Sequence, residues 1–367
     1  IGSHKTGTSS IQRSLYNNKS LLKRYNIEYF TKSTHILKYQ ILDNVGNYVY
    51  YNLKSKKFII SSKLSEDLKK TSPSKTIIIS SEDFWNIDYN EYKIFFNELK
   101  KEFDEIDIIA YIRRQDELAL SLYQEILKMD SSYYNQLISL DDIFIKDPQK
   151  TPFYNYYQIF DNLLRFIPKE RIKIKIFEKK LLKNQNVVDD FFNLIGINND
   201  YQRFSENISV SSNQLQVLKI LHKRRVDPIV RKYIIEQIKN NDKKFYPKKS
   251  SAKLFYNKLK NHNRELNRNF NISKNEYLFT DNFDQYGYSE ENNTEIIKSE
   301  ITNLINSRYW SLYSFSILFK HKIIKGYMYI LYHIFSFFRL FFPGVSFLRK
   351  IEKNYIDRIF SMHRQIS

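Results

Sequence analysis

Ile1-Gly-Ser-His-Lys-Thr-Gly-Thr-Ser-Ser-Ile-Gln12 is a run of mostly small residues that carries one lysine and leads into an expected helix. Its two glycines permit backbone angles that are closed to other residues, so consecutive N–H groups can turn toward one point. We expect Thr8 or Ser9 to cap the helix. An anion docked here would meet backbone N–H groups, the positive helix end and the Lys5 ammonium. The alternative is an ordinary turn followed by a capped helix.

The order of residues in this loop distinguishes it from a nucleoside-triphosphate P-loop. A P-loop places its lysine after the second glycine, whereas Lys5 precedes Gly7. A lysine followed by Thr-Gly-Thr-Ser at the start of a helix resembles the 5'-phosphosulfate-binding loop of sulfotransferases that use 3'-phosphoadenosine 5'-phosphosulfate (PAPS). The resemblance implies that the 5' end of this donor is bound by Lys5, Thr6, Gly7, Thr8 and Ser9.

Composition limits the class of protein. The chain has 367 residues, of which 42% are apolar and 16% aromatic, which is enough to bury one large core or two modest ones. A formal net charge of +19 favours anionic partners, such as nucleic acid, acidic lipid or an anionic substrate. The absence of cysteine excludes thiol catalysis, disulfides and thiolate metal sites. It also favours a reducing compartment, so we expect a cytoplasmic protein.

A short β-branched run at residues 75–81 predicts a strand buried on both faces of a parallel sheet. The polar residues 17–75 before it are expected to form a connecting helical layer. Glu82 follows the strand, at the sheet edge where open α/β folds bind ligands. Alternatively, Glu82 is the acid of a helix N-terminus or of a surface ion pair.

The next strand–helix units contain a second candidate anion site. Apolar spacing predicts a helix over residues 89–103 and a buried strand over 107–112, followed by Arg113 and Arg114. Arg113 and Ser121 are eight positions apart, at the strand exit and two turns along a helix expected from about Glu117 to Lys128, so both can face one cleft. A guanidinium and a hydroxyl there suit a terminal phosphate. The alternative pairs Arg113 with Asp116 or Glu117 and leaves Ser121 on the helix surface.

Arg113, Ser121 and Tyr123 together are similar to the 3'-phosphate motif of PAPS-dependent sulfotransferases. The resemblance continues through a strand at 171–177 and a helix ending in a Phe-x-x-x-x-Gly turn at 187–196, and it covers residues 1–215. It implies a P-loop-like α/β core with a parallel sheet flanked by helices. It is closest to the bacterial and heparan-type carbohydrate branch, in which a carboxylate at the position of Glu82 is the catalytic base.

The remainder of the chain is basic. Residues 216–311 are expected to complete the domain with helices near 215–223 and 295–306. Residues 312–367 carry nine Lys or Arg against two acids, interleaved with aromatic residues. The apolar stretch between Lys325 and Arg339 is shorter than the roughly 20 residues that a spanning helix needs. An interfacial amphipathic segment on the inner face of an anionic membrane and a helix packed on the core remain open readings.

The predicted function is transfer of a sulfuryl group from PAPS to a hydroxyl or amine of a carbohydrate, a cell-envelope glycan or a small molecule. Lys5 and Glu82 are the predicted catalytic residues, Arg113 and Ser121 hold the 3'-phosphate, and no metal is required. One alternative is another P-loop nucleotide enzyme. The other is a non-catalytic basic protein that binds acidic membranes or nucleic acid, although we expect no nucleic-acid partner.

Overall fold

A computed structural model of the chain describes residues 5–30, 49–52, 57–60, 63–69, 76–81, 83–129, 137–139, 143–204, 210–223, 225–226, 228, 231, 234–235 and 244–286. The chain divides into two compact units. The first comprises residues 1–126, 131–209 and 246–289, and the second residues 127–130, 210–245 and 290–367. Every predicted site residue belongs to the first unit. The predicted divisions at residues 215 and 311 stay predictions.

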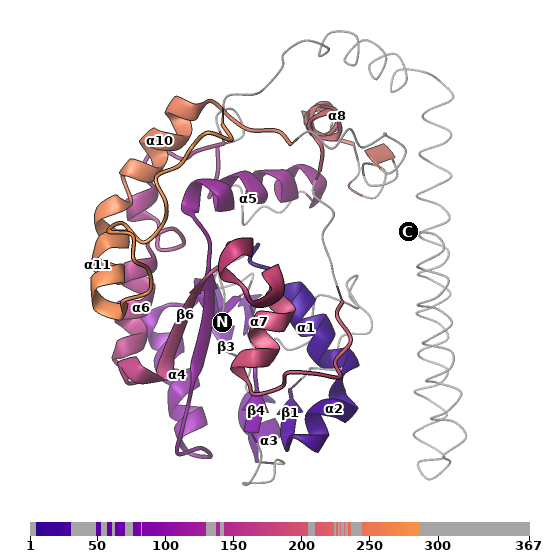
Figure 1. Ribbon diagram of the computed structural model, residues 1–367, viewed down its shortest axis with the longest axis vertical. Coiled ribbons are helices and arrows are strands. Elements are labelled where there is room, and N and C mark those ends of the chain that lie inside the picture. Colours follow the sequence, from indigo (N-terminus) through magenta and orange to yellow (C-terminus); the bar gives the residue numbers. More distant parts are fainter. Residues whose placement is uncertain are drawn as a thin grey trace. The chain divides into compact units, whose positions relative to one another are not determined.

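Helices make up much of the described structure (Figure 1). Those lying wholly or mainly in the first unit are α1 (Thr8–Asn17), α2 (Lys19–Arg24), α3 (Lys63–Leu68), α4 (Tyr89–Lys100), α5 (Gln115–Met129), α6 (Tyr156–Leu164), α7 (Val187–Leu194), α10 (Lys249–Asn257) and α11 (Lys260–Phe270). Short 3-10 turns are η1 (Asp83–Asn86), η3 (Pro148–Lys150), η4 (Lys169–Arg171), η5 (Lys179–Leu181) and η6 (Lys183–Gln185). In the second unit, α8 (Ser212–Lys223) confirms the helix expected near residues 215–223.

The described strands form three separate pairs, two parallel and one antiparallel. β1 (Ile27–Tyr29) runs parallel to β4 (Thr76–Ile78), with Ile27 opposite Thr76. β5 (Ile108–Ile112) runs parallel to β6 (Ile172–Ile176), with Ile108 opposite Ile172. β2 (Val49–Asn52) and β3 (Lys57–Ile60) are antiparallel. Parallel strands connected through helices give the α/β class that the sequence predicts.

The predicted strands at 107–112 and 171–177 are confirmed, and they are direct neighbours. The strand expected over 75–81 is shorter, because regular pairing ends at Ile78. The connecting helical layer predicted over residues 17–75 is wrong in part, since β1, β2 and β3 lie there. The strands are only three or four residues long, too short for alternation along the sequence to be recognised.

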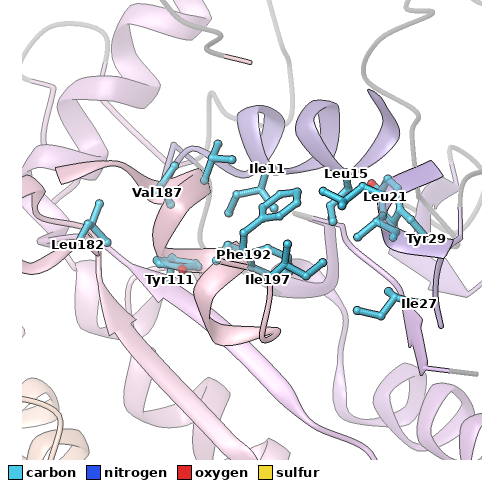
Figure 2. Packing of buried hydrophobic residues seen from close by; sticks show 13 residues of the cluster. Ile11, Leu15, Leu21, Ile27, Tyr29, Tyr111, Leu182, Val187, Phe192 and Ile197 are labelled. Atoms are coloured by element: carbon cyan, nitrogen blue, oxygen red, sulfur yellow. The ribbon is translucent and has the colours of Figure 1, made fainter. Parts of the chain in front are cut away.

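A buried apolar cluster joins α1 to α7 and to the strands (Figure 2). Ile11 and Leu15 of α1 lie four positions apart and so share one helix face, which contacts the same core as Phe192 and Ile197. Tyr111 of β5 extends this core under α7. The cluster therefore fixes the start of α1 relative to the end of β5, and these are the two places where the sequence predicts anion-binding residues.

Candidate functional site

The loop before α1 has the left-handed backbone that its glycine allows. Gly7 has φ +76° and directly precedes the helix, and the Ile11 N–H donates to the Gly7 carbonyl. Lys5 also has a positive φ, 63°, which is uncommon for a residue with a Cβ. A Cβ on Gly7 would lie 2.8 Å from Val187 Cγ1 and 3.2 Å from Phe177 Cε2, so a larger residue fits here only if these side chains shift.

The expected cap at Thr8 or Ser9 is wrong. The helix begins at Thr8, and Gly7 occupies the capping position without a side chain to bond the first N–H groups. The first turn of α1 contains no acidic residue. Thr6 and Thr8 are buried, and Ser9 is half-buried. Gly7 therefore supplies no capping side chain, and the first turn of α1 supplies no carboxylate, to the positive end of this helix.

Arg113 connects the end of β5 to this loop. Its Nη1 donates to the Lys5 carbonyl oxygen at 3.4 Å, across 108 residues of sequence. Its Nε donates to Glu117 Oε2 at 3.1 Å, and the guanidinium lies 5.9 Å from the centre of the Phe177 ring. The Tyr156 hydroxyl donates to the Arg113 carbonyl at 2.6 Å, which holds the backbone. The structure thus brings together Lys5 and Arg113.

Arg114 has a different role from its neighbour. It is buried and donates to both carboxylate oxygens of Asp116, at 2.8 and 2.9 Å. Its Nη1 also donates to the carbonyls of Thr280 and Asn282, and its guanidinium lies 4.4 Å from the Phe283 ring centre. Burial opposes the charge, but Asp116 raises the pKa of Arg114 overall. Arg114 is therefore committed to internal partners, and Arg113 is the more accessible arginine of the pair.

Helix α5 presents polar side chains at intervals of four residues. Glu117, Ser121 and Glu125 share one face by this spacing. Lys5 Nζ lies 3.1 Å from Glu125 Oε2, and these two side chains are 21% and 30% exposed. Since Glu117 pairs with Arg113, each of the two cations of the candidate site meets a carboxylate of α5. Ser121 is half-buried on the same helix.

Glu82 lies outside the described residues, but the segments on both sides of it are placed. Gln12 of α1 donates to Ser80 Oγ at 3.2 Å, so the chain just before Glu82 contacts the helix that follows the Lys5 loop. On the other side, Phe84 and Trp85 are buried, and Trp85 Nε1 donates to the Phe153 carbonyl at 3.1 Å. His4 also lies outside the described residues, as do the helix expected at 295–306 and the segment 312–367.

Sequence reasoning missed Glu125 and Gln12 as residues of this region. The recurrence of Glu117, Ser121 and Glu125 every four positions was a usable signal, because it places three polar groups on one helix face. No comparable signal marks Gln12. Its role depends on a contact with Ser80 across 68 residues.

The described residues lack two features, a cluster of metal-ligating side chains and a membrane-spanning helix. No group of three or more His, Cys, Asp or Glu side chains that could hold a metal ion occurs among them. Within the same residues, no helix is long and apolar enough to cross a membrane.

Comparisons with known proteins give distant matches. No protein-family model matches the chain. An uncharacterized protein of Archaeoglobus fulgidus is 25% identical over 262 residues, which cover 67% of this chain and 68% of that protein. Among solved structures, a sulfotransferase from Alicyclobacillus acidocaldarius matches 65% of this chain and 95% of its own, with 14% identity and a TM-score of 0.34.

Proposed function

We propose that the protein is a sulfotransferase that uses PAPS as its sulfuryl donor. The observation that carries the proposal is the contact between Arg113 Nη1 and the Lys5 carbonyl. It joins the two segments that resemble the 5' and 3' binding motifs of this donor. A helix start whose capping position is a glycine lies here together with two cations, and such an arrangement suits a ligand with two anionic groups.

Each candidate residue holds one part of the donor or takes part in the transfer. The N–H groups of residues 6–9 and the Lys5 ammonium hold the sulfated 5'-phosphate, and Arg113 and Ser121 hold the 3'-phosphate. The bound donor supplies a sulfuryl group, whose S–O bond to the 5'-phosphate breaks as the acceptor oxygen or nitrogen forms a new bond to sulfur. Lys5 stabilises the charge that develops on the departing phosphate oxygen, and Glu82 takes the acceptor proton.

The test of donor binding is a thermal shift with adenosine 3',5'-bisphosphate, without magnesium. This ligand should raise the melting temperature, since it binds the folded state, and ADP should have a smaller effect because it lacks a 3'-phosphate. Arg113→Ala should weaken bisphosphate binding by about 1.5–3 kcal/mol. Arg268→Ala is the control, because it removes an exposed arginine that pairs with Glu265 on α11. An equal response to ADP and the bisphosphate, or a requirement for magnesium, would favour another nucleotide enzyme.

The test of the base is Glu82→Gln, which keeps the size of the side chain but cannot accept the proton. Turnover with a hydroxyl acceptor should fall by about two to four orders of magnitude, and bisphosphate affinity should stay close to that of the wild type. Unchanged turnover would exclude Glu82 as the base.

The acceptor and the location of the enzyme are also proposals. We favour a glycan or small-molecule hydroxyl as the acceptor, at the inner face of an anionic membrane through residues 312–367. Each Lys or Arg near such a surface contributes about 1 kcal/mol of attraction, which salt screens. Co-sedimentation with acidic and neutral vesicles tests the attachment. Equal recovery of the protein with acidic and neutral vesicles, at both low and high salt, would refute the membrane attachment.

A further inference from the structure

Both cations of the candidate site are neutralised by the chain itself. Arg113 pairs with Glu117 and Lys5 pairs with Glu125, at 3.1 Å in each case. The two carboxylates are eight residues apart on α5, which corresponds to about 12 Å along the helix. Any anion that enters must therefore compete with carboxylates that already hold its binding groups.

The two carboxylates differ in how firmly the rest of the protein holds them. Glu117 also accepts from Gln285 Nε2 at 3.2 Å and lies 3.9 Å from Arg114 Nη2. Within the described part of the chain, Glu125 has one ionic partner, the Lys5 ammonium. Its side chain is 30% exposed, so water can solvate the carboxylate when that pair opens. Glu117 keeps other partners if Arg113 turns away, whereas Glu125 is held by Lys5.

We infer that Glu125 is an exchangeable counter-ion of Lys5, which holds the lysine beside α5 in the free protein and releases it to an incoming phosphate or sulfate group. The inference rests on the proposed function for the identity of its ligand. Glu125 is then a positioning residue that acts through Lys5. Its carboxylate lowers anion affinity, because the ion pair must open before the Lys5 ammonium can bind the anion.

The expected effect is modest, because a partly exposed ion pair contributes little. Pairs of this kind are typically worth at most about 1 kcal/mol, so loss of Glu125 should tighten anion binding by no more than about fivefold. The effect should require Lys5. Replacing Lys5 with methionine removes the group for which the carboxylate and the ligand compete.

The experiment is a double-mutant cycle on the dissociation constant, measured by calorimetry with the full chain. The four proteins are wild type, Glu125→Gln, Lys5→Met and the double variant, and the ligands are adenosine 3',5'-bisphosphate and inorganic pyrophosphate. Glu102→Gln is the control for net charge, since Glu102 is an exposed residue in the turn after α4. Glu125→Ala is a second variant, and circular dichroism checks that each protein is folded.

We expect Glu125→Gln to tighten binding, by no more than about fivefold, in the wild-type background and to have no effect beside Lys5→Met. Weaker binding, the same change in both backgrounds or the same change with Glu102→Gln would overturn the inference. The protein could instead bind pyrophosphate but not the bisphosphate, with pyrophosphate affinity depending on Glu125 only when Lys5 is present. This result would support the counter-ion and refute the proposed function. If neither ligand binds, both proposals fail.

Discussion

Helices α1 and α7 pack on each other, yet their first turns differ in capping residue and in charge. Helix α7 begins after Asn186, whose side chain accepts from the N–H groups of Val188 and Asp189. Its first turn carries Asp189 and Asp190. Helix α1 begins after Gly7 and has neither a side-chain cap nor an acid in its first turn.

The acids at the start of α7 are fully engaged. Asp189 accepts from Asn184 and Tyr201 and pairs with Arg203, and Asp190 accepts from Tyr111 and the Lys183 N–H and pairs with Lys175. The chain thus compensates one helix end internally. At the other it places the cations Lys5 and Arg113, whose carboxylate partners come from α5. Of these two helix starts, α1 is the one whose charge favours an external anion.

Alkaline pH should produce the largest effect, because two buried tyrosine hydroxyls donate to buried aspartates, Tyr111 to Asp190 at the start of α7 and Tyr286 to Asp116. Burial raises the pKa of Tyr111 and of Tyr286 above the ordinary value of 10, and the neighbouring Asp190 and Asp116 raise them further. A raised pKa in the folded state gives stability that is present below pH 10 and is lost as the pH rises. Each tyrosine should cost about 1.4 kcal/mol per pH unit above 10, so two cost about 5.5 kcal/mol at pH 12.

Urea unfolding between pH 8 and 12 measures this loss. Tyr111→Phe should be less stable at pH 8 but should lose stability less steeply above pH 10, because one titrating group is gone. Stability that stays constant to pH 12 would contradict the assignment of these hydroxyls.

Gly7→Ala should have the next largest effect, at the start of α1. The added methyl meets Val187 and Phe177 and also forces an alanine into the left-handed region. The combined cost is about 2–4 kcal/mol. Gly196→Ala is the matched control, since Gly196 has φ +81° but nothing lies within 4 Å of its added Cβ. It should cost about 1 kcal/mol. Equal losses in denaturant unfolding would show that the contact of α1 with α7 is loose.

Asn186→Ala should have the smallest effect on stability. It tests whether the start of α7, unlike that of α1, is unimportant for ligand binding. Loss of a cap costs about 1–2 kcal/mol of stability. Affinity for adenosine 3',5'-bisphosphate should stay within about twofold, because the Asn186 side chain accepts from N–H groups of α7. A larger fall in affinity would mean that the start of α7 also takes part in binding.

Sequence reasoning located the parts of this site that carry local signals. The strand predicted over 107–112 and the helix predicted from about Glu117 to Lys128 match β5 and α5, so Arg113 follows a strand and Ser121 lies on a helix as expected. The short strands β1 to β3 carry no such pattern. Their existence depends on pairing with partners elsewhere in the chain or across a turn.

Ion pairing at the site depends on tertiary placement and was therefore not predictable in full. That Arg113 pairs with Glu117 was an open alternative, since the two are four residues apart on the entry to a helix. That Lys5 pairs with Glu125 depends on a contact across 120 residues. That Arg114 is buried with internal partners while Arg113 is more accessible likewise depends on distant groups, the carbonyls of Thr280 and Asn282.

The hydrogen bonds that hold Arg114 have a consequence for the biosynthesis of the protein. The carbonyl partners of Arg114 lie 166 and 168 residues later in the chain, and Tyr286, which donates to Asp116, lies 170 residues after that acid. Closing a loop of this length is slow compared with forming a local helix. On the ribosome, residues 113–116 after β5 are synthesised long before residues 280–286, which hold them, have been translated. The candidate anion site is therefore completed only after synthesis has passed residue 286, and a shorter nascent chain carries the candidate binding residues without the segment that supports them.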